Sequence, residues 1–145
     1  MAAPPSERRS ALSVRSARTC ERILDAAGDC FAAVGFAKTT VDEVAARAGV
    51  SKALVYHYFT GKEAILDAVL QRTVAEWERL TIDELAAAEG SVLDRIAQMH
   101  RACMAYAGKA PVLRAILEFD PRILLGTGAG RAMKQSMERL LAALE

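Results

Sequence analysis

The chain has 145 residues, of which 52% are hydrophobic and 26% charged, and its formal net charge at pH 7 is +1. This length allows one or two small units with a buried core. Alanine and leucine are frequent while proline, glycine and aromatic residues are few, a composition that favours helices over strands. The near-zero net charge shows that the chain as a whole lacks the basic excess typical of nucleic-acid-binding proteins. We therefore expect a soluble, all-α protein.

The cysteines and the hydropathy pattern bear on the cellular compartment. Cys20, Cys30 and Cys103 are odd in number and lack metal or redox spacing, so we expect neither a disulfide framework nor a metal site. Free thiols suit a reducing cytoplasm. No apolar run reaches the roughly 18 residues that a membrane-spanning helix needs, and residues 1–18 are too polar for a signal peptide. These features predict a cytoplasmic protein that does not contact membranes.

The N-terminal segment contains Pro, Ser and several Arg residues. Residues 1–15 are predicted to form a mobile tail. Its arginines allow two interpretations, an arm that lies in a DNA minor groove or a solvated tail that attracts DNA only diffusely, and we favour the second. The first helix is expected from about Ser16 to Val34, with Gly35 ending it. Its apolar stripe consists of Ile23, Ala27, Cys30, Phe31 and Val34.

Residues 40–62 contain signals for two short helices in close succession. Thr40 and Glu43 form a capping-box pattern, which marks a helix start. Gly49 stands where a left-handed residue commonly ends a helix, and Ser51 is a good N-cap for the next one. Two short helices joined by a glycine-containing turn are the helix-turn-helix pattern, whose second helix enters the DNA major groove by its N-terminal end.

The second of these helices supplies the candidate DNA contacts. Leu54, Val55 and Phe59 are expected to face a core formed by three helices, which leaves the other side chains to reach outward. Helix starts attract phosphate, and a lysine adds positive charge. The same spacing also fits a plain helical hairpin whose tyrosines only pack, and spacing alone leaves both interpretations open. The candidate DNA-binding residues are Thr40, Ser51, Lys52, Ala53, Tyr56, His57 and Lys62.

A family resemblance favours the DNA-binding interpretation. From Gly35 to Leu66 the chain reads G-F-x-x-T-T-V-D-E-V-A-x-x-A-G-V-S-K-x-x-V-Y-H-Y-F-x-x-K-E-x-I-L. This segment resembles the DNA-binding domain of the tetracycline-repressor (TetR) family, and the likeness covers roughly residues 18–70. It implies a transcriptional repressor that binds double-stranded operator DNA as a homodimer and is released by a small-molecule effector. The family usually has a polar capping residue directly before the lysine, where this chain has Gly61.

A long helix from Lys62 to about Leu80 is predicted to connect a DNA-binding domain, residues 16–76, to a C-terminal helical bundle, residues 77–145. Either Thr60 or Gly61 could cap its start. Further helices are expected over about 91–108, 111–119 and 131–145.

The family resemblance implies a small apolar effector and a dimer interface in the C-terminal region. Family members are generally longer, so we expect this region to be incomplete and leave open whether it dimerises. The same residue types more often fill a core than bind a ligand, and we favour that alternative for each single residue. The candidate effector-binding residues are Trp77, Met99, His100, Cys103, Met104 and Tyr106.

The two halves of the chain differ in charge. Residues 1–62 carry 9 Lys and Arg against 6 Asp and Glu, a net charge of +3, whereas residues 63–145 carry 10 against 12, a net charge of −2. The basic excess therefore lies in the half that would meet DNA.

No enzyme motif supports catalysis, because the sequence has no Glu-x-x-His pair, no Cys or His cluster and no Gly-x-Ser-x-Gly turn, and we expect no cofactor. The alternative to a DNA-binding regulator is a helical interaction or ligand-binding protein that keeps the fold without using DNA.

Overall fold

The structure of the protein is a computed structural model, and it describes residues 5–112, 114–115 and 127–142. Within these ranges every regular element is a helix, which confirms the predicted all-α class. Most of the helix expected over 111–119 falls outside the described residues. The helices whose bounds lie within the described residues are α1 (Pro5–Val34), α2 (Val41–Ala48), α3 (Lys52–Tyr58), α4 (Lys62–Ala87), α5 (Val92–Lys109) and α8 (Gly128–Ala142).

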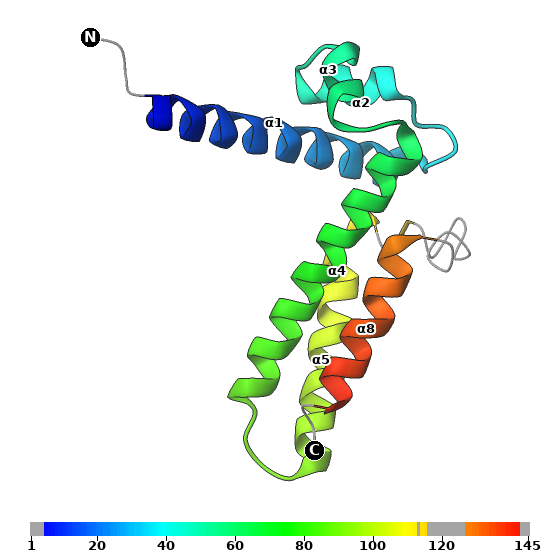
Figure 1. Cartoon of the computed structure of the whole chain (residues 1–145). Helices are drawn as coiled ribbons and strands as arrows, with labels where there is room; N and C mark the ends of the chain where they lie inside the picture. Colours follow the sequence, from blue (N-terminus) through cyan, green and yellow to red (C-terminus); the bar gives the residue numbers. More distant parts are fainter. Residues whose placement is uncertain (1–4, 113, 116–126, 143–145) are drawn as a thin grey trace.

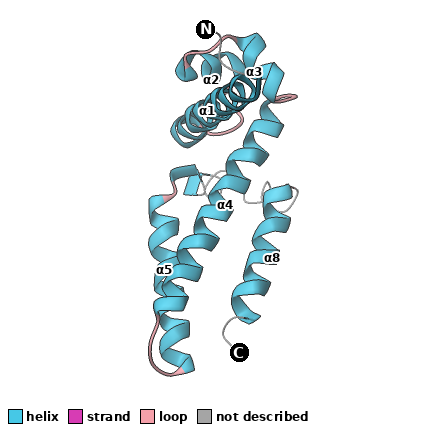
Figure 2. Cartoon of the chain, turned by 60° about the vertical axis from the view of Figure 1, so that its left-hand side comes forward, coloured by secondary structure: helices cyan, strands magenta, loops and turns pink. Residues whose placement is uncertain are grey.

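The helices form two groups that share α4. Figure 1 shows α1, α2 and α3 gathered around the first turns of α4, and α5 and α8 alongside the rest of it. Figure 2 shows the second group turned, with α4 lying between α5 and α8. The long helix was predicted to end near Leu80, but it continues to Ala87 and so forms the spine of the second group.

The start of α1 differs from the sequence prediction. The helix begins at Pro5, whereas the sequence predicted a tail over residues 1–15 and a helix start near Ser16. Proline is favoured in the first turn of a helix because no backbone donor is needed there. Residues 6–15, which were predicted to belong to the tail, are mostly good helix formers and contain no glycine or second proline. The segment from residue 5 onward is therefore helical.

The core of the first group draws large side chains from each of its helices. Ile23 and Phe31 of α1, Val44 of α2, Val55 of α3 and Ile65 of α4 are each no more than 1% exposed. Burying each of them stabilises the fold by roughly 1.5–3 kcal/mol. This core includes the three helices that the sequence predicted to pack together and also takes in α4, and it holds α3 in place from one side.

Not every residue of the predicted stripes is buried. Leu54 and Phe59 are half-buried at the edge of the core. Val34 is 48% exposed, although its spacing placed it on the apolar stripe of α1. It is the last residue of α1, and periodicity does not indicate how far along a helix the neighbouring helices reach.

The second group is held by apolar and polar contacts to α4. Trp77 and Leu85 of α4 are buried against α5. On the other side the Ser136 hydroxyl donates to Oε2 of Glu78 at 2.7 Å, and the Arg139 guanidinium pairs with the same carboxylate. These two contacts hold the pKa of Glu78 below its usual value, with the larger effect from Arg139. The polar contacts join α8 to α4 while α5 packs mainly through apolar side chains.

Candidate nucleic-acid interface

The two short helices and the turn between them are defined by local hydrogen bonds. At the start of α2 the Thr40 backbone N–H donates to Oε2 of Glu43 at 2.8 Å, and the Glu43 N–H donates to Oγ1 of Thr40 at 3.3 Å. This reciprocal capping holds the pKa of Glu43 below its usual value, chiefly through the backbone hydrogen bond from Thr40. The predicted capping box is therefore present.

The turn and the next helix also follow the predicted pattern. Gly49 has φ 65° and ψ 39°, the left-handed conformation that glycine adopts without steric cost. The Ser51 hydroxyl then accepts the Leu54 N–H at 3.1 Å and caps α3. Because Val50 and Ser51 are the only residues between Gly49 and Lys52, the start of α3 is tied closely to the end of α2. The arrangement is a helix-turn-helix.

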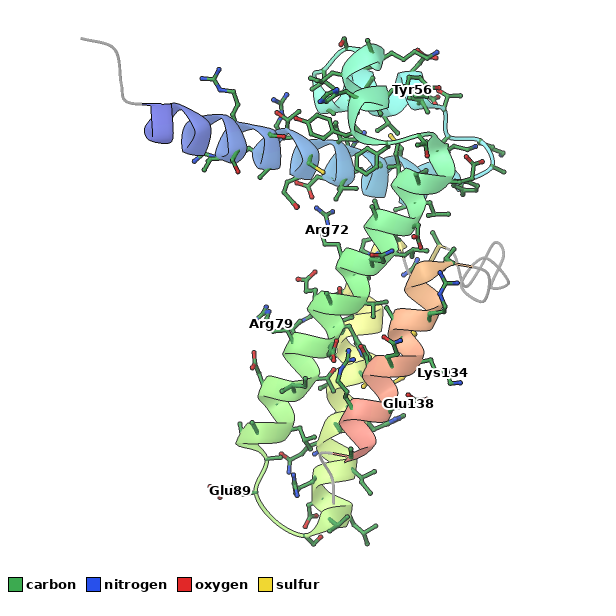
Figure 3. All side chains as sticks on the ribbon, in the orientation of Figure 1. Tyr56, Arg72, Arg79, Glu89, Lys134 and Glu138 are labelled. Carbon is green, nitrogen blue, oxygen red and sulfur yellow. The ribbon has the colours of Figure 1, made fainter. Side chains whose placement is uncertain are left out.

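The outer side of α3 carries most of the predicted DNA contacts. Ser51, Lys52, Ala53, Tyr56 and His57 are all exposed, whereas Val55 on the inner side is buried. Thr40 is likewise exposed, at the start of α2. Figure 3 labels Tyr56, at the end of the molecule remote from Lys134 and Glu138 of α8. The structure thus gathers six of the seven candidate residues on the helix-turn-helix.

Lys52 has an acidic partner within this surface. Its Nζ lies 2.7 Å from Oδ2 of Asp42, a residue in the first turn of α2. The hydrogen bond that Lys52 donates to Asp42, and then the negative charge of Asp42, raise the pKa of Lys52. Sequence reasoning identified Lys52 but gave no role to Asp42.

Lys62, the seventh candidate, is engaged inside the protein. Its Nζ donates to the carbonyl oxygen of Phe36 at 2.9 Å and to that of Ala37 at 3.3 Å, and it lies 4.4 Å from the centre of the Phe36 ring. The side chain joins the start of α4 to the α1–α2 connection, and it is set apart from the outer side of α3. The sequence left open whether Thr60 or Gly61 caps the start of α4. The N-cap is Gly61, and it supplies no side-chain hydrogen bond.

Two further contacts that sequence reasoning missed position the helix-turn-helix. The Arg22 guanidinium of α1 donates to the carbonyl oxygens of Ala48 and Gly49, which lie at the end of α2. The hydroxyl groups of Ser16 and Tyr58 are 3.0 Å apart, so α1 also reaches the last residue of α3. The partners are 26 to 42 residues apart in the chain, and no local pattern indicates them.

The candidate effector residues divide into two sets. Met99, Cys103 and Tyr106 of α5 pack on Trp77 of α4. His100 and Met104 are exposed, Met104 by 61%, and they face away from this cluster. Each follows a cluster residue by one position, which rotates its side chain by about 100° around the helix axis. The structure therefore does not bring all six candidates together, since His100 and Met104 lie apart from the cluster.

A cavity of about 260 Å³ lies between α4 and α5, beside the Trp77 cluster. Tyr106 is the one predicted effector residue among those that line it. Its hydroxyl donates to the carbonyl oxygen of Thr73 at 3.1 Å and to Oε2 of Glu76 at 3.2 Å. Burial, and then the charge of Glu76, raise the pKa of Tyr106 to about 12. The lining residues are Thr73, Glu76, Leu80, Tyr106, Lys109, Ala110, Pro111 and Val112.

The described residues include no group of three or more His, Cys, Asp or Glu side chains placed to hold a metal ion. None of the helices in these ranges combines the length and the apolar character that crossing a membrane requires. Cys20, Cys30 and Cys103 are free thiols, and burial raises the pKa of the first two.

Comparison with known proteins gives the helix-turn-helix a family. Residues 23–69 match the family model described as bacterial regulatory proteins, tetR family. The helix-turn-helix is therefore of the tetR-family type. The matched range lies within residues 18–70, over which the resemblance was expected, so the predicted family is confirmed.

Curated relatives in the tetR family are similar over the N-terminal part. The HTH-type transcriptional regulator SrpR of Pseudomonas putida is 46% identical over 52 residues, which are 36% of this chain and 24% of that protein. The A-factor receptor protein of Streptomyces griseus is 34% identical over 71 residues, 48% of this chain and 26% of the receptor. The chain therefore spans about a quarter of the length of these relatives.

Solved tetR-family structures extend the similarity to the C-terminal helices. A TetR family transcription regulator from Marinobacter aquaeolei VT8 has a TM-score of 0.75 at 20% identity, covering 91% of this chain and 69% of that one. At this identity the likeness concerns the fold alone. A gamma-butyrolactone receptor (ArpA like protein) has a TM-score of 0.58 at 33% identity, covering 70% and 50%.

Proposed function

We propose that this chain binds double-stranded DNA through α3 and regulates transcription, as a repressor that a small molecule releases from its operator. The observation that carries the proposal is the geometry of α3. Val55 fixes the helix from within, and Lys52, Ala53, Tyr56 and His57 face outward. A short helix presented in this way fits the DNA major groove by its N-terminal end.

The candidate residues divide into two roles. Thr40 and Ser51 stand at the starts of α2 and α3 and are assigned to phosphate contacts, which position a protein on the duplex without reading sequence. Lys52 and Ala53, in the first turn of α3, are assigned to base edges, because an ammonium pairs with guanine acceptors and a methyl group with thymine. Tyr56 and His57 follow on the same outer side of α3.

The proposal includes a homodimer in the cytoplasm. We assign DNA binding to residues 16–76 and effector binding and dimerisation to residues 77–145. Two reading helices must match successive major grooves about 34–36 Å apart, and an effector that prefers another spacing weakens DNA binding. The similar proteins named as receptors support an effector. Apolar side chains exposed on α5 support self-association, and they are Val92, Leu93, Ile96 and Met104.

The test measures binding to DNA duplexes by fluorescence anisotropy and oligomeric state by size-exclusion chromatography with light scattering. We expect a dimer whose affinity for random duplex falls between ~50 and ~200 mM salt, by about 0.9 log units per log unit of salt for each phosphate contacted. A species that binds no duplex at any salt concentration would favour the alternative, a helical interaction or ligand-binding protein.

Sequence preference tests the assignment of α3 as the reading helix. The variant Lys52→Gln should change the duplexes that are enriched by repeated selection from a random pool, because a base contact is altered. The matched control is Lys134→Gln, which removes the same charge from an exposed position on α8. If both variants select the same duplexes as the original chain, α3 does not read DNA.

A further inference from the structure

The ion pair between Asp42 and Lys52 lies across the start of the reading helix. Asp42 is in the first turn of α2, Lys52 is the first residue of α3, and Nζ and Oδ2 are 2.7 Å apart. The two side chains are 66% and 50% exposed. The neighbouring acidic residue, Glu43, is occupied by the capping box with Thr40. The carboxylate that faces Lys52 is therefore that of Asp42.

This pair contributes little to the stability of the fold. Exposed ion pairs contribute little or nothing to stability, since water screens the charges and the long side chain loses freedom. The packing of α2 against α3 rests on buried residues such as Val44 and Val55. A role other than stability is consistent with the position of the pair, on the surface that the proposed function places against DNA.

The charge of Asp42 opposes phosphate binding at this position. Affinity for DNA of any sequence comes mainly from lysines and arginines that replace counterions on phosphates. An ammonium that is already held by a carboxylate is less available for that exchange, and the carboxylate itself repels a phosphate. The same contact keeps the Lys52 side chain in one place, so less freedom is lost when it meets a base edge.

We infer that Asp42 is a specificity-determining residue, which withholds Lys52 from non-specific phosphate contacts and orients it for base recognition. The inference rests on the proposed function. Specificity is a difference between two affinities, and it increases when binding to the wrong partner is weakened. Asp42 acts here through Lys52, and it is a positioning residue.

The decisive experiment compares Asp42→Asn with Asp29→Asn on a random duplex. Asp29 pairs with Arg47 at 3.0 Å and is 62% exposed, so each variant removes one carboxylate from an exposed ion pair of the same domain. We expect Asp42→Asn to bind the duplex about 5- to 10-fold more tightly at ~0.1 M salt. The slope of log affinity against log salt concentration should become steeper by about 0.9, the value for one additional phosphate contact. We expect Asp29→Asn to change the affinity by less than about twofold, because Arg47 is on the far end of α2.

A third variant tests whether Lys52 carries the effect. In the double variant Asp42→Asn/Lys52→Gln the tighter binding and the steeper salt dependence should both disappear. Thermal melting of each variant checks that the fold is kept. Equal changes in the two single variants, or a gain that persists in the double variant, would overturn this inference and leave the proposed function standing. If neither the original chain nor any variant binds a duplex, both are overturned.

Discussion

Replacement of Lys62 by methionine is the sharpest test of what this side chain does. Methionine keeps an unbranched apolar stem near the Phe36 ring but removes the ammonium, which donates to the carbonyl oxygens of Phe36 and Ala37. Hydrogen bonds from a charged donor contribute about 1.5–3 kcal/mol, and a cation over an aromatic ring about 0.5–1 kcal/mol at an exposed site. Lys62 is half-buried and water can replace it at the carbonyls, so we expect a net loss of about 1–2 kcal/mol.

Thermal unfolding followed by circular dichroism measures this loss. A chain of this size loses roughly 2–4 °C in Tm for each kcal/mol, so Lys62→Met should melt about 2–8 °C below the original chain. The control is Lys38→Met, which removes the same charge from an exposed position in the same connection. Equal melting temperatures for the two variants would show that the ammonium does not hold the α1–α2 connection.

The salt dependence of DNA binding separates two roles for Lys62. If the side chain only holds the connection, Lys62→Met binds more weakly at every salt concentration with an unchanged slope. If the third N–H of the ammonium reaches a phosphate, as expected from the sequence, the slope of log affinity against log salt concentration becomes shallower by about 0.9 in Lys62→Met. The geometry favours the first outcome, since the ammonium already has two acceptors inside the protein.

Three further substitutions test the supports of the fold. Gly49→Ala should reduce the free energy of unfolding in urea by about 1–2 kcal/mol, because Gly49 has a φ of 65°; an unchanged midpoint would contradict the left-handed turn. Arg22→Met should cost about 1–3 kcal/mol in the same assay, since it leaves carbonyl groups at the end of α2 without their donor. The pKa of Tyr106 is raised from 10 to about 12 in the folded state, so its contribution to stability is complete below pH 10 and is lost as the pH rises through 12. Tyr106→Phe should therefore lose less stability than the original chain between pH 10 and 12, and parallel losses would refute the assignment.

The DNA-facing part of the protein was largely predictable, because its signals are local. A capping box closes over three residues, a left-handed glycine ends a helix at its own position, and Ser51 caps the helix that it precedes. These contacts need no distant partner, so residue order alone determined where α2 and α3 begin and end. Periodicity then separated the buried Val55 from the exposed Tyr56.

The C-terminal candidates illustrate where periodicity was insufficient. Met99, His100, Cys103 and Met104 lie on one broad side of α5, and the sequence could not indicate how much of that side its neighbour covers. The structure places α4 against the Met99 and Cys103 side, so Met104 remains 61% exposed.

Residue order alone thus determined the all-helical class, the helix-turn-helix and the outward side of α3, since each depends on contacts within one or two turns of chain. Tertiary structure alone decided the partners of the charged side chains: Lys52 with Asp42, Lys62 with the Phe36 carbonyl, and Arg22 with the end of α2. Those partners are 10 to 26 residues away in the chain, and a charge can reach whichever oppositely charged or polar group packing brings near it. Packing therefore determines which cations remain available to DNA, and the sequence identifies only the cations themselves.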